Sequence, residues 1–179
     1  MSRKQSMAKI RMLAWCCLAV FGLALAAAPA WAAAPVTVKV EVTMSGAPSA
    51  VLPAGDDPKH TVGMGKSKGE AIFSDGRKAQ YSNVYFMDIY LGKYAKTWGY
   101  TKMVFKKGEW LFFKWDAAFV GRDKAGKPVF AGTGKLIKGT GVYKGIKGTV
   151  KFKNRQLPPS KELPKGGTGA SAVITYTLP

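Results

Sequence analysis

Short segments in which apolar side chains recur at every second position constrain the fold of this sequence more than any other feature. In the first, residues 36–44, valines alternate strictly with polar side chains, and this period of two predicts a half-buried β-strand. Turn-forming dipeptides such as Asp75-Gly76 and Lys107-Gly108 separate the segments. Further strands are expected at 70–73, 79–90, 98–106, 109–119, 128–137, 149–156 and 170–178.

This pattern predicts an all-β fold, an eight-stranded antiparallel β-barrel, and no amphipathic helix. Closing the sheet leaves no unpaired edge, and glycines permit the bends that closure needs. Residues 45–68, which contain three prolines and Asp56-Asp57, are expected to form a long loop. In residues 109–119 aromatic side chains occupy both faces, so we expect one face to line the core and the other to meet a neighbour.

Residues 1–32 have the features of a cleaved signal peptide: basic residues, the apolar run 12–28, and Ala30-Trp31-Ala32 as a cleavage site. The apolar run is short for a membrane span. We therefore expect one exported domain, residues 33–179, which is periplasmic or secreted and has no transmembrane segment after cleavage. Both cysteines lie in the removed part, so core packing has to stabilise this domain without disulfides.

Positive charge is the second strong constraint. The chain has a formal net charge of +18, and removing the four basic residues of 1–32, which include no acid, leaves +14. Ten basic residues and no acidic one lie between Lys124 and Lys161. We expect an anionic envelope component as a partner, such as lipid head groups, lipopolysaccharide or acidic polysaccharide; the alternative is that the charge serves only solubility. The candidate anion-binding residues are Lys135, Lys138, Lys144, Lys147, Lys151, Lys153 and Arg155.

A glycine-rich stretch, residues 126–148, lies within this basic half. A phosphate-binding loop needs the spacing G-x-x-x-x-G-K-[ST], and a dinucleotide fold needs G-x-G-x-x-G between a strand and a helix. Neither arrangement is found in the stretch, so no nucleotide partner is expected. Its glycines indicate barrel corners and a tight turn about Tyr143, while backbone amides that bind an anion or ligand remain an alternative.

The same part of the chain carries a resemblance. Trp115-Asp116, a Gly-Lys-Pro turn, Gly132-Thr133-Gly134 and the run 139–149 (GTGVYKGIKGT) are similar to the signature of the allene oxide cyclase-like barrel families, whose architecture dirigent proteins share. The resemblance implies an eight-stranded barrel with a central cavity. The plant cyclases are trimers that cyclise an unstable fatty-acid epoxide. No catalytic residue is transferred to this chain by the resemblance, and the 45–68 segment departs from the compact plant pattern.

Aromatic and acidic side chains in the middle strands are the candidates for binding a ligand. The aromatic ones also suit core packing, and the two acids also suit structural ion pairs with Lys114 or Arg122. The six candidates are Asp88, Trp98, Tyr100, Trp110, Trp115 and Asp116.

His60 is the only histidine of the chain, and it is either a group for proton transfer or an exposed loop residue. A metal site would need partners from Asp56, Asp57 or Glu70, and this arrangement is too loose to predict one. No metal and no cofactor are expected.

Two classes of function remain open for the chain. The first is an exported module that binds a small hydrophobic or amphipathic molecule in the barrel interior. The second is an isomerase or cyclase whose confined pocket steers a reactive substrate, with catalytic residues unknown. A buried acid or amide that converges on the cavity would favour the enzyme, and an apolar cavity would favour the binder. Ligand identity and a homo-oligomeric state stay open.

Overall fold

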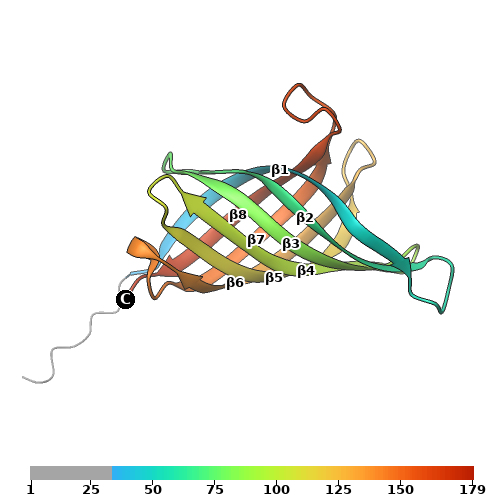
Figure 1. Ribbon diagram of the computed structural model, residues 1–179, viewed down its shortest axis with the longest axis horizontal. Coiled ribbons are helices and arrows are strands. Elements are labelled where there is room, and N and C mark those ends of the chain that lie inside the picture. Colours follow the sequence, from blue (N-terminus) through green and yellow to red (C-terminus); the bar gives the residue numbers. More distant parts are fainter. Residues whose placement is uncertain (1–33) are drawn as a thin grey trace, which may run out of the picture. The chain divides into compact units, whose positions relative to one another are not determined.

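The computed structural model describes residues 34–179, so the expected signal peptide at 1–32 lies outside the described part. Within 34–179 the chain forms one closed barrel in which each strand is antiparallel to the next and the last pairs with the first (Figure 1). The predicted eight-stranded antiparallel barrel is confirmed. The strands are β1 (Val36–Pro53), β2 (His60–Phe73), β3 (Lys78–Tyr90), β4 (Tyr94–Phe105), β5 (Trp110–Arg122), β6 (Pro128–Gly139), β7 (Lys147–Leu157) and β8 (Gly167–Thr177).

Alternation along each strand decides which side chains form the core. In β1, Val38, Val40, Val42 and Met44 are buried while the residues between them are exposed, as the period of two predicted. In β5 the face that carries Leu111 and Phe113 is the inner one. No helix in residues 34–179 is long and apolar enough to cross a membrane. Between β6 and β7, the single turn of 3-10 helix η1 (Gly141–Tyr143) confirms the tight turn expected about Tyr143.

The prediction of a long loop at residues 45–68 is wrong. β1 runs on to Pro53 and β2 begins at His60, so the connection is only residues 54–59. The ladder between β1 and β8 ends at Met44 and Thr168, so residues 45–53 have a strand neighbour on one side only. A proline can occupy such an edge because no neighbour needs its missing N–H, and the β1–β2 register shifts between Pro48 and Ala50.

Glycines in this segment also mark close backbone approach and not a loop. A Cβ on Gly46 would lie 2.3 Å from the carbonyl oxygen of Lys66 on the neighbouring strand, so no larger residue fits. Most of the prolines and glycines of 45–68, which are residue types typical of loops, therefore lie within the paired strands β1 and β2.

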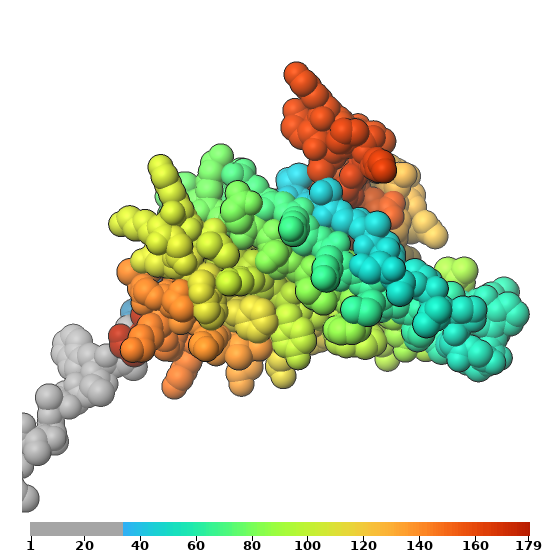
Figure 2. Space-filling model, viewed as in Figure 1, coloured from blue at the N-terminus to red at the C-terminus, as the bar shows by residue number. Residues whose placement is uncertain are grey.

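A projection results at one end of the barrel, which we call the tongue (residues 47–66 and 84–100). Beyond Met44, β1 has left β8, and residues of β4 before Lys96 have no partner on β5. Figure 1 shows the β1–β2 hairpin and the β3–β4 turn protruding together. In the space-filling view of Figure 2 the tongue is the tapered cyan to green projection.

The opposite end of the barrel is packed solid, and we call it the packed end. Phe73, Phe105 and Tyr143 are buried there, and the guanidinium of Arg77 lies 5.2 Å from the ring centre of Phe73. Arg77 also donates hydrogen bonds to the Tyr143 hydroxyl and, from Nε at 2.8 Å, to Asp75. This pairing lowers the pKa of Asp75 and raises the pKa of Arg77. One end of the barrel is thus closed by core packing.

Candidate functional site

The barrel interior holds a cavity of about 310 Å³ to which all eight strands contribute lining residues. Its wall is largely apolar and includes Met44, Met87, Met103, Phe113 and Phe152. Because the lining continues to the start of β6, the end of β7 and the start of β8, the cavity opens at the end of the barrel that carries the tongue. Unbranched methionines adapt to ligands of different shape, which suits a binding wall.

A buried polar network interrupts this apolar wall. The side-chain oxygen of Asn83 accepts hydrogen bonds from Trp115 Nε1 at 3.2 Å and from Thr101 Oγ1 at 3.4 Å, and its amide nitrogen donates to Ser67 Oγ at 3.3 Å. The Tyr81 hydroxyl lies 3.3 Å from Thr101 Oγ1. Asn83, Ser67 and Thr101 are buried, so these bonds offset the cost of removing their polar atoms from water.

Almost no charge reaches the cavity. Of the described residues that line it, Arg155 is the only charged one, and no Asp, Glu, Lys or His contributes. Burial raises the pKa of Tyr81 to about 12 and also raises that of Tyr85, so both phenols are neutral at pH 7. The cavity can orient a molecule by hydrogen bonds and exclude water from it, but no lining group exchanges a proton near neutral pH.

A second constellation, centred on His60, lies at the tip of the tongue and outside the cavity. The ring nitrogens of His60 are 2.7 Å from Asp56 Oδ1 and 2.9 Å from Asp88 Oδ1, and the ring stacks on Tyr90 with centroids 5.0 Å apart. The hydrogen bond to Asp88 is the main cause of a raised pKa for His60 and of a lowered pKa for Asp88.

Tyrosine hydroxyls complete this cluster, which we call the latch (Asp56, Asp57, His60, Asp88, Tyr90 and Tyr94). Tyr90 donates to Asp57 Oδ2 at 2.5 Å, which raises the pKa of Tyr90 to about 12, and the Tyr94 hydroxyl is 3.3 Å from His60 Nε2. The latch ties the 54–59 connection to the β3–β4 turn. His60 is therefore a partly covered structural residue at the start of β2 and not an exposed loop residue. No group of His, Cys, Asp and Glu in the described range is arranged to hold a metal ion.

No protein-family model and no curated protein matches the chain. Among solved structures it is similar to the pterocarpan synthase dirigent protein GePTS1, with 14% identity over 82% of this chain and 90% of that chain and a TM-score of 0.43. A similarity of this size carries no argument about activity. The barrel architecture rests on the closed strand pairing itself.

Of the six residues predicted to bind a ligand, the structure places Trp115 on the cavity. Trp98 and Tyr100 alternate with the inward-facing Thr97 and Thr101, so they lie on the outer wall. A molecule in the interior would contact Trp115 and none of the other five. The other outward-facing candidates are Asp88, Trp110 and Asp116.

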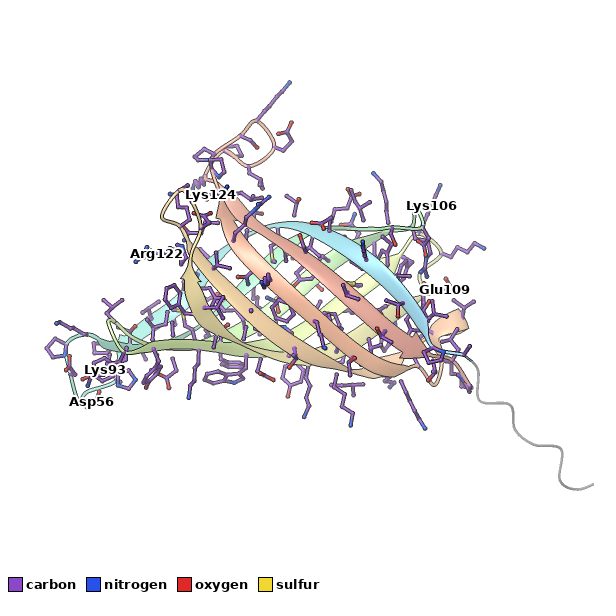
Figure 3. The ribbon with its side chains drawn as sticks, turned by 180° about the vertical axis from the view of Figure 1, so that it is seen from behind. Asp56, Lys93, Lys106, Glu109, Arg122 and Lys124 are labelled. Atoms are coloured by element: carbon purple, nitrogen blue, oxygen red, sulfur yellow. The ribbon has the colours of Figure 1, made fainter. Side chains whose placement is uncertain are left out.

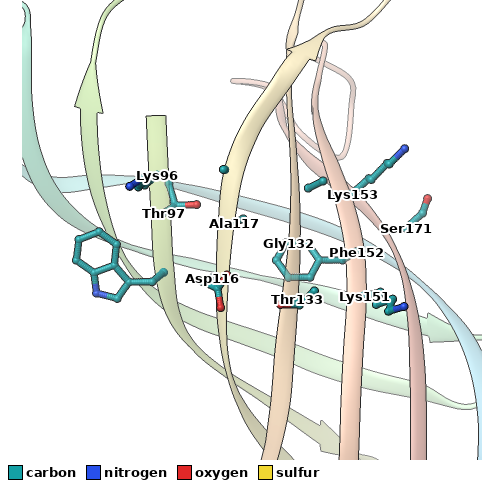
Figure 4. A pocket seen from close by; sticks show the side chains of 13 residues that line it. Lys96, Thr97, Asp116, Ala117, Gly132, Thr133, Lys151, Phe152, Lys153 and Ser171 are labelled. Carbon is teal, nitrogen blue, oxygen red and sulfur yellow. The ribbon is translucent and has the colours of Figure 1, made fainter. Parts of the chain in front are cut away.

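Asp116 lies on the outer wall in a row that crosses from Trp98 to Thr133 and Lys151. Figure 4 shows the shallow outer hollow that these residues line. The ion pair considered for Asp116 does not form in the described structure, and Arg122 donates to the carbonyl oxygen of Gly126 at 2.8 Å. Asp88 is paired, but its partner is His60.

Sequence reasoning missed the network around Asn83. Its members come from β2, β3, β4 and β5, so no local spacing reveals it. One signal was present: Tyr81 and Asn83 are in phase with Ala79, which shares their inward face. A polar residue in phase with the core face is a candidate for a buried site.

The predicted anion-binding lysines are only partly brought together. Lys135, Lys138 and Lys147 line one outer hollow, and Lys114 from β5 joins them. Lys114 and Lys135 are direct cross-strand partners, an arrangement that is unfavourable without a counter-ion. Lys144 lies in the turn after η1 and is not part of this hollow. The remaining residues, Lys151, Lys153 and Arg155, are exposed along β7.

Proposed function

We propose that this chain is an exported protein that binds a small, largely uncharged amphipathic molecule in its barrel. The observation that carries the proposal is an apolar cavity, open at one end, with a buried hydrogen-bonding network in its wall. Ligand sites typically occupy about 300–1,000 Å³ and combine an apolar lining with a few polar groups. The cavity of about 310 Å³ has this composition and takes a molecule at the small end of that range.

The lining assigns different roles to its polar groups. The Tyr85 side chain borders the cavity, and its hydroxyl makes no hydrogen bond to another residue of 34–179, so it is available to a ligand. The Asn83 network fixes the orientation of the Trp115 ring, which forms part of the wall. Arg155 at the mouth would meet a polar or anionic end of the ligand.

An isomerase or cyclase is the second candidate, and the buried amide of Asn83 is the observation that favours it. The oxygen of this amide already accepts two hydrogen bonds, and the described lining contains no carboxylate or imidazole. Positioning and exclusion of water are then the only means of catalysis that the cavity offers. Binding therefore remains the first proposal.

Native mass spectrometry of the protein purified from its own host tests the proposal. We expect a retained small molecule in the wild type and its loss in Ala170→Phe, because this buried residue lines the cavity and a phenyl ring would fill it. Ser171→Phe is the matched control, since the neighbouring side chain is exposed on the outer wall. Circular dichroism checks that both variants fold. Retention of the same ligand by Ala170→Phe would contradict binding in the interior.

The lysines of the outer hollow support an anionic envelope component as a partner, in addition to the interior ligand. The directly opposed Lys114 and Lys135 are the specific observation, because an anion between them would relieve their repulsion. Binding to an acidic polysaccharide, measured against salt concentration, should weaken steeply as salt rises. A flat response would leave solubility as the role of the charge.

A further inference from the structure

The outer face of the tongue is apolar, although the outer face of a barrel strand is ordinarily polar. The strand register places Ala50, Met64, Phe86 and Trp98 side by side in one row across β1 to β4. Leu52 and Val62 lie next to this row on the side of the 54–59 connection, and Val84 and Tyr100 lie next to it on the side of the barrel. We call these eight residues the apolar patch.

The apolar patch is open to solvent and has its own shape. Leu52 is 63% exposed, Trp98 44% and Tyr100 46%. Trp98 stacks on Phe86 with centroids 6.0 Å apart. A hollow of about 370 Å³ lies over the members of the patch other than Val84 and Tyr100. A contiguous exposed apolar surface on a small domain marks an interaction site, whereas single exposed apolar residues do not.

Charge around the apolar patch identifies the kind of partner. Cross-strand neighbours at its border are Lys66, beside Val84, and Lys114, beside Tyr100; Lys96 and Lys102 lie along β4 on either side of it. The described acids at this border are Asp88, which is bound to His60, and Asp116. A second copy of this chain would bring the same excess of positive charge to the contact, so self-association is opposed.

We propose that the apolar patch docks on the surface of an anionic lipid bilayer. Aromatic and aliphatic side chains enter the boundary between head groups and acyl chains, where Trp and Tyr are favoured. The lysines at the border extend to the lipid phosphates, with their aliphatic stems against the apolar surface. Apolar contact and charge attraction then act on the same face. This inference does not depend on the ligand in the barrel.

Co-sedimentation with vesicles tests this docking. The protein is produced from its full-length reading frame, and its N-terminus is determined by mass spectrometry. Vesicles of pure phosphatidylcholine are compared with vesicles in which about one lipid in three is the anionic phosphatidylglycerol. We expect binding to the anionic vesicles only, and a blue shift of the tryptophan emission. Replacing Lys66 and Lys96 by Glu should weaken binding by at least about 25-fold, since each lysine near an anionic surface contributes about fivefold.

Matched variants separate the patch from the net charge of the protein. Lys106→Glu with Lys107→Glu makes the same charge change in an exposed turn at the packed end, and it should lower binding much less. Met64→Ser should abolish binding, while Val173→Ser, at an exposed position on β8, should not. Equal loss in both charge variants, or binding that Met64→Ser leaves intact, would overturn the proposal. So would sedimentation velocity showing a stable oligomer that Met64→Ser dissociates.

Discussion

The packed end and the tongue both place a basic side chain against aromatic rings and carboxylates, yet they differ in what holds them together. At the packed end, Arg77 lies over the rings of Phe73 and Phe105, which belong to the core. At the tongue, His60 lies between Tyr90 and Tyr94, which the core does not include. Figure 3 shows the two ends apart, with Asp56 and Lys93 at one and Lys106 and Glu109 at the other.

Because of this difference, the packed end should stay closed at any physiological pH, whereas the latch at the tongue should depend on pH. An arginine keeps its charge at any physiological pH, and burial of its aromatic neighbours adds hydrophobic stabilisation. A histidine changes charge near neutral pH, and the latch has few apolar contacts to replace its ion pairs. The packed end should therefore resist opening, and the tongue should open locally before the barrel unfolds.

The largest expected effect is at the packed end. Phe105→Ala removes a buried ring that contacts Phe73 and Tyr143, and we expect a loss of about 3–5 kcal/mol in the free energy of unfolding. Chemical denaturation followed by circular dichroism measures it. Tyr94→Ala at the tongue is the comparison and should cost much less, because Tyr94 is exposed. Equal losses at the two sites would remove the distinction between the ends.

A smaller effect is expected when the hydrogen bonds of Arg77 are removed but its bulk is kept. Arg77→Met leaves the Tyr143 hydroxyl without the guanidinium donor and leaves Asp75 with only the backbone N–H of residue 77, which should lower the free energy of unfolding by about 1–3 kcal/mol. Arg122→Met is the control, since this guanidinium reaches only a turn carbonyl in an exposed region. If Arg122→Met destabilised the protein as much as Arg77→Met, the closure would not depend on the Arg77 contacts.

The smallest effect is a pH dependence confined to the tongue. The pKa of His60 is raised in the folded protein, so its contribution is fully present below the unfolded value of 6.5 and is lost as pH rises through the folded value. Amide hydrogen exchange in residues 54–60 and 90–94, corrected for intrinsic rates, should accelerate across this interval. The packed end should not change there, because the pKa of Asp75 is lowered and its contribution is lost only in acid.

His60→Gln provides the control for the pH dependence. The amide can replace part of the hydrogen bonding but carries no charge, so the tongue should exchange faster at low pH and show no further change on raising it. A pH dependence that survives in His60→Gln would assign the effect to another group in the latch.

The tongue shows where local sequence patterns fail. Prolines and glycines between 45 and 68 indicated a loop, but the prolines of β1 are tolerated because β8 begins beside Met44 and leaves residues 45–53 with one free edge. Pairing partners set this edge, and they lie more than a hundred residues away in the chain. Likewise, the choice between Trp98 and Thr97 for the cavity depends on the register of β4 with β3 and β5.

The sequence by itself determined the strand periodicity, the turns and the eight-stranded barrel, because alternation and turn geometry depend on residues next to one another. It also determined the positive charge and the aromatic content of the strands. Tertiary structure alone decided that Trp115 faces the cavity and Trp98 the solvent, that Asn83 joins four strands, and that His60 pairs with Asp88. These outcomes follow from closure of the barrel, which fixes the inner face of each strand through partners distant in the chain.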